Sequence, residues 1–349
     1  GTLIYVTGEL THRNLCTYEN AMRISAAATG VLFVLIFLLY GLLLSKVKKE
    51  QRQTMYIIIV LASVVLFPEY LTWNNFGRTD EYLMMGTVFC LILLVAERLE
   101  WLIIPVCAVM VLVHEGFVFT NAGLILAILF YKCMTGDKKK YGIILLLSFL
   151  CMSMLFSYFA FFREPVSVDV YREIEAHAKE TAEGMKHFND AYSLLDSELL
   201  VESVYEAEAP WRQKNRAEFP LFILLFLPYI IMTIRFMAGI ITEKKEAAYR
   251  LTYLGAFLGI LTIVPEYILK VDYGRWVFCT IIYIVFIIMV LVAAGDEAVC
   301  KRLSSSKWAN VMLSSAAVYL FLFVPFRDVY ISDITTAIMD RVAQVLHLW

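Results

Sequence analysis

Long apolar runs are the feature that most constrains what this sequence can fold into. Lipid offers no hydrogen-bond partner to the backbone, so a chain crosses a bilayer as a helix of about 20 residues or as a closed barrel. Most of the apolar runs in the 349 residues have the length of a spanning helix. They lie near 25–45, 55–72, 82–97, 101–119, 122–133, 141–161, 219–241, 249–269, 276–295 and 308–326. The sequence therefore predicts an all-α polytopic membrane protein with about ten transmembrane helices.

Composition supports this class and excludes several others. Hydrophobic residues make up 60% of the chain and charged residues 18%, whereas soluble domains have about 45–50% and about 25%. This excludes a cytosolic enzyme, a disordered protein and a secreted disulfide scaffold. A net charge of -2 leaves no basic face for a phosphate backbone, so we expect no nucleic-acid partner. The seven cysteines show neither metal-ligand spacing nor a disulfide framework, and we expect no metal site.

The fourth and fifth runs have an unusual combined length. From Trp101 to Lys132 there are 32 residues, which would make about 48 Å of helix at 1.5 Å per residue. This is too long for one ordinary span and too short for two. The sequence therefore predicts a broken or partly re-entrant pair that turns near residues 120–123.

Basic residues are distributed unevenly between the two sides of the predicted bundle. Ten alternating spans place 16 Lys and Arg residues in short connections on one side, against seven on the other side outside the long loop 162–218. Short cytoplasmic loops are enriched in Lys and Arg, so the 16 mark the cytoplasmic side. Both ends of the sequence and the loop 162–218 then face outward. A chain that starts on the outer side is unusual, and Gly1 is not an initiator Met. We therefore expect a further span before residue 1.

The loop 162–218 divides the chain into two helical halves. Residues 1–161 hold about six spans, with the break near 114–123, and residues 219–349 hold about four. The loop has 13 acidic and 7 basic residues, and its segment 168–204 has apolar residues at helical spacing. We expect one or two amphipathic helices there, which lie on the outer leaflet or cover a cavity as a lid.

A short repeat marks two of the predicted outer turns. Residues 68–78 (PEYLTWNNFGR) align without a gap on residues 265–275 (PEYILKVDYGR), with Pro, Glu, Tyr, Gly and Arg identical. In one interpretation, each copy is a helix-end staple in which Glu and Arg pair and an aromatic residue fixes the depth in the membrane. In the other, Arg78 and Arg275 flank one outward cavity and hold a diphosphate or an acidic sugar. The presence of two copies favours the second interpretation.

Carboxylates in and beside these two copies are further candidate site residues. Each copy carries a glutamate, Glu69 and Glu266, and Asp80 and Glu81 follow the first copy within one turn. Glu69, Asp80 and Glu266 are candidate general bases, because a carboxylate can accept a proton from a hydroxyl group. Glu81, together with Asp272 inside the second copy, is a candidate for binding substrate.

His114, Glu115 and Gly116 interrupt the fourth apolar run. Ionisable groups inside a span are costly and are therefore functional candidates. The zinc-protease motif HExxH needs a second His at position 118, which is Val here, so a metalloprotease is excluded. Two interpretations stay open: His114 binds substrate with Glu115 as a catalytic base, or one of them bonds a neighbouring helix and locks the break. The depth of the pair in the membrane favours a site.

With its many spans, outward arginines and carboxylates, and one long outer loop, the sequence resembles bacterial membrane enzymes of surface-polysaccharide assembly. The resemblance is to glycosyltransferases of the GT-C class and to O-antigen polymerases of the Wzy/EpsG kind. It implies a bacterial cytoplasmic membrane protein that transfers sugar from a polyprenyl-phosphate-linked donor at the outer face. Arginines of two outer loops, here Arg78 and Arg275, would hold the (di)phosphate. No tightly held cofactor is demanded, although a divalent cation is compatible with such a donor.

One departure from GT-C enzymes concerns the first outer loop, where those enzymes place an acidic base. Residues 1–24 contain Glu9 and Glu19 but no adjacent acidic pair. The competing class is a transporter or flippase for a lipid-linked or small anionic substrate, since a broken helix and a same-sense repeat also suit a carrier. The sequence leaves the sugar, its linkage, the acceptor and the oligomeric state open.

Overall fold

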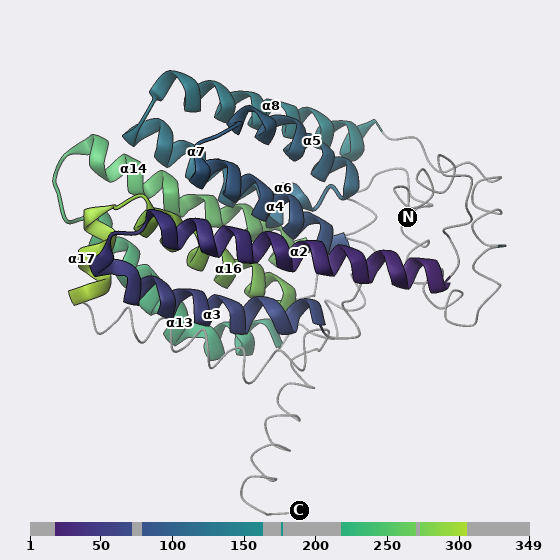
Figure 1. The fold of residues 1–349 in the computed structure, drawn as a ribbon, viewed down its shortest axis with the longest axis horizontal. Coiled ribbons are helices and arrows are strands. Elements are labelled where there is room, and N and C mark those ends of the chain that lie inside the picture. The colour runs from purple at the N-terminus through teal and green to yellow at the C-terminus, as the bar shows by residue number, and fades with distance from the viewer. Residues whose placement is uncertain (1–17, 72–78, 163–175, 177–217, 270–272, 306–349) are drawn as a thin grey trace, which may run out of the picture.

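The structure is a computed structural model that describes residues 18–71, 79–162, 176, 218–269 and 273–305 of the chain (Figure 1). About 90% of these residues are helical, and none of them is in a strand. This confirms an all-α fold. The predicted span at 308–326 and almost all of the loop 162–218 lie outside the described residues.

The helices run back and forth along one common direction, as Figure 1 shows. The α-helices are α2 (Tyr18–Lys46), α3 (Arg52–Leu71), α4 (Thr79–Ala96), α5 (Ile103–Val113), α6 (Phe117–Thr120), α7 (Ala122–Thr135), α8 (Lys138–Phe161), α13 (Glu218–Ile241), α14 (Ala247–Leu258), α15 (Val264–Leu269), α16 (Tyr273–Ala293) and α17 (Glu297–Ser305). Short 3₁₀ turns are η1 (Lys49–Gln51), η3 (Glu100–Leu102) and η4 (Gly259–Ile263).

Five of the described helical segments are long and apolar enough to cross a membrane. They are Arg23–Lys46, Thr79–Ala96, Lys138–Phe161, Ala247–Ile268 and Arg275–Ala293. Large apolar side chains on the outward faces of these segments are exposed, among them Phe37 on α2 and Met154 on α8. Such faces are stable in lipid rather than in water. The chain is therefore a membrane protein.

Helix α16 forms the centre of the bundle. Nearly all of its side chains from Trp276 to Ala293 are buried, and α2, α3, α7 and η4 pack around it. The ring of Phe278 lies 6.1 Å from that of Tyr70 on α3, in a T-shaped arrangement. Tyr70 belongs to the first copy of the repeat, and Phe278 follows directly after the second copy (265–275), so the fold brings the ends of the two copies close together.

Helices α5 and α7 form a hairpin of two short helices. With 11 and 14 residues, they are about 16 and 21 Å long, well short of the roughly 30 Å of hydrocarbon in a bilayer. The helix breaks at His114, whose backbone is extended (φ -162°, ψ 123°), and resumes as the single turn α6. Glu97, just before η3, forms an ion pair with Lys132 near the end of α7, so the hairpin returns to the end of the bundle where it began.

A second interrupted helix crosses this hairpin. The helix α14 tightens into the 3₁₀ turn η4 before α15 begins. Pro265 has no N–H to donate to the preceding turn, which favours an interruption there. The Thr262 hydroxyl donates to the carbonyl of Phe119 at 3.0 Å. A Cβ atom on Gly123 would lie only 2.3 Å from the carbonyl oxygen of Gly259, so the crossing requires glycine.

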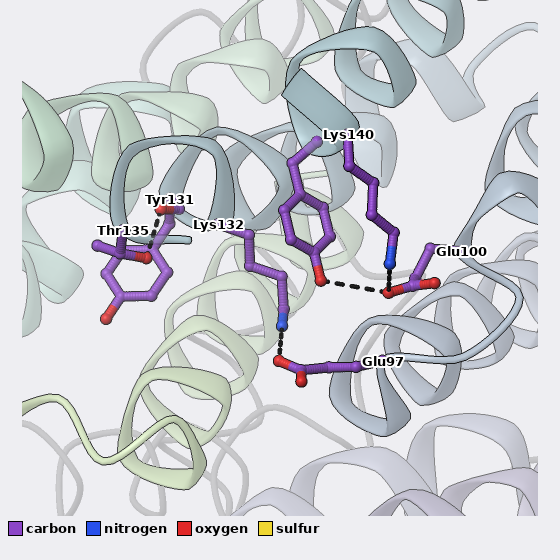
Figure 2. Close-up of polar contacts among 7 residues, drawn as sticks. Glu97, Glu100, Tyr131, Lys132, Thr135 and Lys140 are labelled. Atoms are coloured by element: carbon purple, nitrogen blue, oxygen red, sulfur yellow. Dashed lines mark hydrogen bonds and ion pairs between the residues drawn. The ribbon is translucent and has the colours of Figure 1, made fainter. Parts of the chain in front are cut away.

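One end of the bundle is rich in lysine and is joined by ion pairs. This lysine-rich end comprises the C-termini of α2, α4, α7, α13 and α16 with the connections that follow them. Figure 2 shows its central group, in which Lys132 binds Glu97 and Lys140 binds Glu100, each at 2.7 Å. Tyr141 also donates to Glu100, at 3.2 Å. These bonds connect the α4–η3 turn to α7 and α8.

A buried carboxylate completes the lysine-rich end. Asp296 accepts hydrogen bonds from the hydroxyls of Tyr131, at 2.7 Å, and Tyr253, at 2.5 Å. Its other oxygen accepts from the backbone N–H of Val299 at the start of α17, at 3.0 Å. Asp296 therefore connects α7, α14 and α17, and its charge is compensated by three donors.

Candidate functional site

At the opposite end of the bundle, an ion pair joins the first turns of α4 and α16. The Arg275 guanidinium donates from Nη2 to Oδ2 of Asp80 at 2.5 Å, and the two side chains are only 18% and 22% exposed. The guanidinium also lies 5.1 Å from the centre of the Trp276 ring, which allows a cation–π contact. Two of the predicted site residues, 195 positions apart, are thus in direct contact.

This ion pair lines a small recess with a free volume of about 10 Å³, and we call this end of the bundle the recess end. The lining residues come from α3, α4, the α6–α7 turn and α16. They are Tyr70, Asp80, Met84, Thr120, Asn121, Arg275, Trp276, Phe278 and Cys279. A volume of this size holds about one water molecule. In this conformation the recess therefore admits a larger polar group only if the side chains at its edge move apart.

The floor of the recess is a hydrogen-bonded chain at the break in the hairpin. The Thr120 hydroxyl lies 2.6 Å from Oδ1 of Asn121, and the Asn121 amide donates to Oγ1 of Thr87 at 3.0 Å. Thr87 in turn donates to the carbonyl of Leu83 one turn back in α4. This chain fixes the orientation of the Asn121 side chain. The sequence marks 120–121 as a turn, but it gives no sign that Thr87 lies opposite.

A second polar group surrounds Gly116 at the start of α6. The Gly116 N–H donates to Nδ1 of His114 at 2.9 Å, and Glu115 Oε2 lies 4.0 Å from the same nitrogen. Glu266, on α15, is 96% buried, and its Oε1 lies 3.7 Å from the position that a Cβ on Gly116 would take. Three predicted site residues, His114, Glu115 and Glu266, therefore meet at one point.

The single turn α6 connects the two polar groups. The Thr120 hydroxyl at the recess lies 3.0 Å from the carbonyl oxygen of Gly116. Four residues of helix rise about 6 Å, so the His114–Glu266 group lies about one turn away from the recess. Together they form one candidate site, built from the break in the hairpin, the second interrupted helix and the N-termini of α4 and α16.

The remaining predicted site residues have other positions. Glu81 is fully buried in α4 and is not among the residues that line the recess. Position 69 belongs to α3, but its side chain lies outside the described part of the chain, as do Arg78 and Asp272. The expectation that Arg78 and Arg275 share one cavity therefore stays a prediction.

Within the described residues, no cluster of three or more His, Cys, Asp or Glu side chains could hold a metal ion. No protein-family model, no curated protein and no solved structure matches the chain. Functional assignment therefore depends on the chemistry of the residues around the recess.

Proposed function

We propose that this protein is an integral-membrane glycosyltransferase or polysaccharide polymerase. It takes sugar from a polyprenyl-phosphate-linked donor at the outer face of a bacterial cytoplasmic membrane. The observation that carries the proposal is the Arg275–Asp80 pair in the recess, with Glu115 and Glu266 one helical turn away. An arginine and separate carboxylates are the groups that glycosyl transfer from a phosphate donor requires.

Arg275 suits the leaving group of such a reaction. When the bond between the sugar C1 and the phosphate oxygen breaks, negative charge grows on the (di)phosphate. A guanidinium binds two phosphate oxygens with parallel N–H bonds and stabilises that charge. Before substrate binds, Asp80 holds the guanidinium in the recess at 2.5 Å. The phosphate then shares the guanidinium with Asp80 or replaces it.

The carboxylates suit the other half of the reaction. The acceptor hydroxyl forms the new bond to C1, and its proton must pass to a base. Glu115 and Glu266 lie about one helical turn from the recess. The recess can take up at most the polar head, once Arg275 and Asp80 have moved apart, so the prenyl chain lies outside it in lipid.

The orientation in the membrane follows from charge. Described lysines and arginines gather at the lysine-rich end, in the connections near 46–52, 132–140 and 244–250. Basic residues in short connections favour the cytoplasm. The recess end then faces outward, where lipid-linked sugars are assembled into surface polysaccharides.

The test is release of polyprenyl phosphate or diphosphate from a panel of polyprenyl-linked sugars by the purified protein. We expect Arg275→Ala to lower turnover by about 10²–10³-fold, as loss of a charge-stabilising donor does. Arg275→Lys keeps the charge but loses the planar guanidinium, so its turnover should lie between those of the wild type and Arg275→Ala. Arg250→Ala is the matched control, because Arg250 is exposed at the lysine-rich end. Equal turnover of Arg275→Ala and Arg250→Ala would contradict the proposal.

A transporter or flippase is the second candidate, and one observation favours it. Two interrupted helices cross where Gly123 meets Gly259, and interrupted helices form the substrate sites of many carriers. Protein in sealed vesicles that moves labelled prenyl-diphosphate sugar between leaflets, and releases no free prenyl diphosphate, would select this candidate.

A further inference from the structure

The backbone at the helix break determines which nitrogen of His114 carries the proton. The Gly116 N–H donates to Nδ1 at 2.9 Å, so Nδ1 acts as an acceptor and carries no hydrogen. A neutral imidazole has one N–H, which must then be on Nε2. In this state, Nε2 can donate a hydrogen bond but has no lone pair with which to accept a proton.

Glycine at position 116 makes this contact possible. A Cβ atom there would lie 2.9 Å from Nδ1 and 3.0 Å from Cε1 of the imidazole. Both distances are shorter than a carbon atom tolerates without displacement of the ring. The extended backbone of His114 turns its side chain back over the start of α6. The run His-Glu-Gly therefore holds the imidazole in one tautomer as well as breaking the helix.

Protonation of His114 would break this arrangement. A proton taken up by the imidazole must go to Nδ1, where it would face the Gly116 N–H and cost that hydrogen bond. The group that accepts the proton of the acceptor hydroxyl is therefore a neighbouring carboxylate. Glu266 and the imidazole Nδ1 both lie within 4 Å of the same point, at the position of a Cβ on Gly116.

Burial distinguishes the two carboxylates near His114. The Glu115 side chain is 34% exposed, whereas Glu266 is 4% exposed. Sugar transfer needs a base from which water is excluded, because water competes with the acceptor hydroxyl for the donor. Glu266 meets this condition and Glu115 does not.

We propose that His114 binds an oxygen of the sugar as an Nε2–H donor and that Glu266 is the general base. This assignment rests on the proposed sugar transfer. In the step, the acceptor oxygen bonds to C1 and its proton passes to Glu266. The bond between C1 and the phosphate oxygen breaks, and its electron pair stays on the phosphate held by Arg275. His114 keeps its proton throughout.

Three glutamine variants test the assignment in the transfer assay. Glu266→Gln should lower kcat by about 10²–10⁴-fold, the usual range for loss of a general base. His114→Gln keeps an N–H donor and should raise KM with a loss of kcat below about tenfold. Glu97→Gln, at the lysine-rich end, is the control and should retain wild-type kcat. A kcat for His114→Gln as low as that of Glu266→Gln, or a fully active Glu266→Gln, would overturn the proposal.

NMR of the resting protein determines the tautomer of His114 independently of the transfer assay. In protein labelled with ¹⁵N-histidine, the His114 signals are identified by their loss in His114→Gln. We expect a protonated Nε2 and an unprotonated Nδ1, and we expect Gly116→Ala to disturb both signals. A protonated Nδ1 in the neutral imidazole would overturn the role of His114 even if the protein transfers sugar. Wild-type protein with the expected tautomer but no transfer would instead contradict the proposed function, and with it the role of Glu266.

Discussion

The two ends of the bundle contain the same kinds of charged groups in opposite settings. At the lysine-rich end, Glu97, Glu100 and Asp296 each bind donors that join separate helices across short connections. At the recess end, Asp80 and Arg275 form a pair that lines an open space, beside interrupted helices. The first arrangement connects helices through buried or bridging bonds, whereas the second leaves an ion pair at the edge of a recess.

The two ends also differ in which backbone conformations depart from a regular helix. At the lysine-rich end, the described residues with a left-handed backbone include Glu97 and Leu99 in the turn after α4, with φ of +59° and +54°. At the recess end, two helices are interrupted inside the bundle, and each interruption leaves backbone groups that need new partners. Such interruptions are retained where they form a site or a path.

The substitution with the largest expected effect on stability tests the crossing of the interrupted helices. Gly123→Ala places a methyl group 2.2 Å from Thr262 Oγ1 and 2.3 Å from the Gly259 carbonyl oxygen, and backbone there cannot yield. We expect a loss of about 3 kcal/mol in stability, at the upper end for overpacking, measured by thermal unfolding in detergent.

The control is Gly41→Ala in α2, where nothing lies within 4 Å of the added Cβ atom. It should raise the stability by about 0.5–1 kcal/mol through helix propensity. Equal effects of the two changes would contradict the crossing.

The buried pair at the lysine-rich end gives the next largest effect. Glu100→Ala removes the acceptor for both Lys140 and Tyr141. A hydrogen bond to a charged group contributes about 1.5–3 kcal/mol, so we expect a loss of that order in the free energy of unfolding. Sugar-transfer kcat at a temperature below unfolding should stay at the wild-type value. A kcat that falls as far as in Arg275→Ala would show that the two ends do not differ as described.

The exposed pair at the same end gives the smallest effect and a pH dependence. The hydrogen bond from Lys132 lowers the pKa of the Glu97 carboxyl below its ordinary value. The ion pair therefore contributes its full stabilisation of the folded state above the unfolded pKa of about 4.3. This stabilisation is lost as the pH falls through the folded pKa of Glu97. Because Glu97 is 57% exposed, we expect at most about 1 kcal/mol. Glu97→Gln should lower the unfolding temperature slightly at pH 7 and by less at pH 3, whereas an equal decrease at both would contradict the ion pair.

The sequence predicts the helices better than the contacts between them. Apolar runs of spanning length mark the segments near 25–45, 141–161 and 276–295, because lipid imposes that length. The break at 114–116 follows from a charged pair and a glycine inside such a run. The turn η4 is harder to predict, since only Gly259 and Pro265 mark it and the residues between them are apolar or Thr.

The partners in the candidate site come from long-range packing, which no local pattern encodes. In one interpretation of the repeat, Glu266 and Arg275 pair with each other within the second copy. In the structure, Arg275 binds Asp80, which follows the other copy, while Glu266 lies against the break in the hairpin. Both contacts depend on how α15 and α16 pack against α4 and α6. The sequence thus singles out these residues as candidates, but it does not predict which of them come into contact.

The most direct test of the account is the binding of a soluble prenyl diphosphate to the recess end. Titration of the purified protein with geranylgeranyl diphosphate should show binding that Arg275→Ala weakens by about 10- to 100-fold, the equivalent of a charged hydrogen bond. Arg250→Ala and Glu100→Ala, which alter the lysine-rich end, should bind as the wild type does. Unchanged affinity in Arg275→Ala, or an equal loss in all three variants, would contradict the claim that the recess end is the anion site.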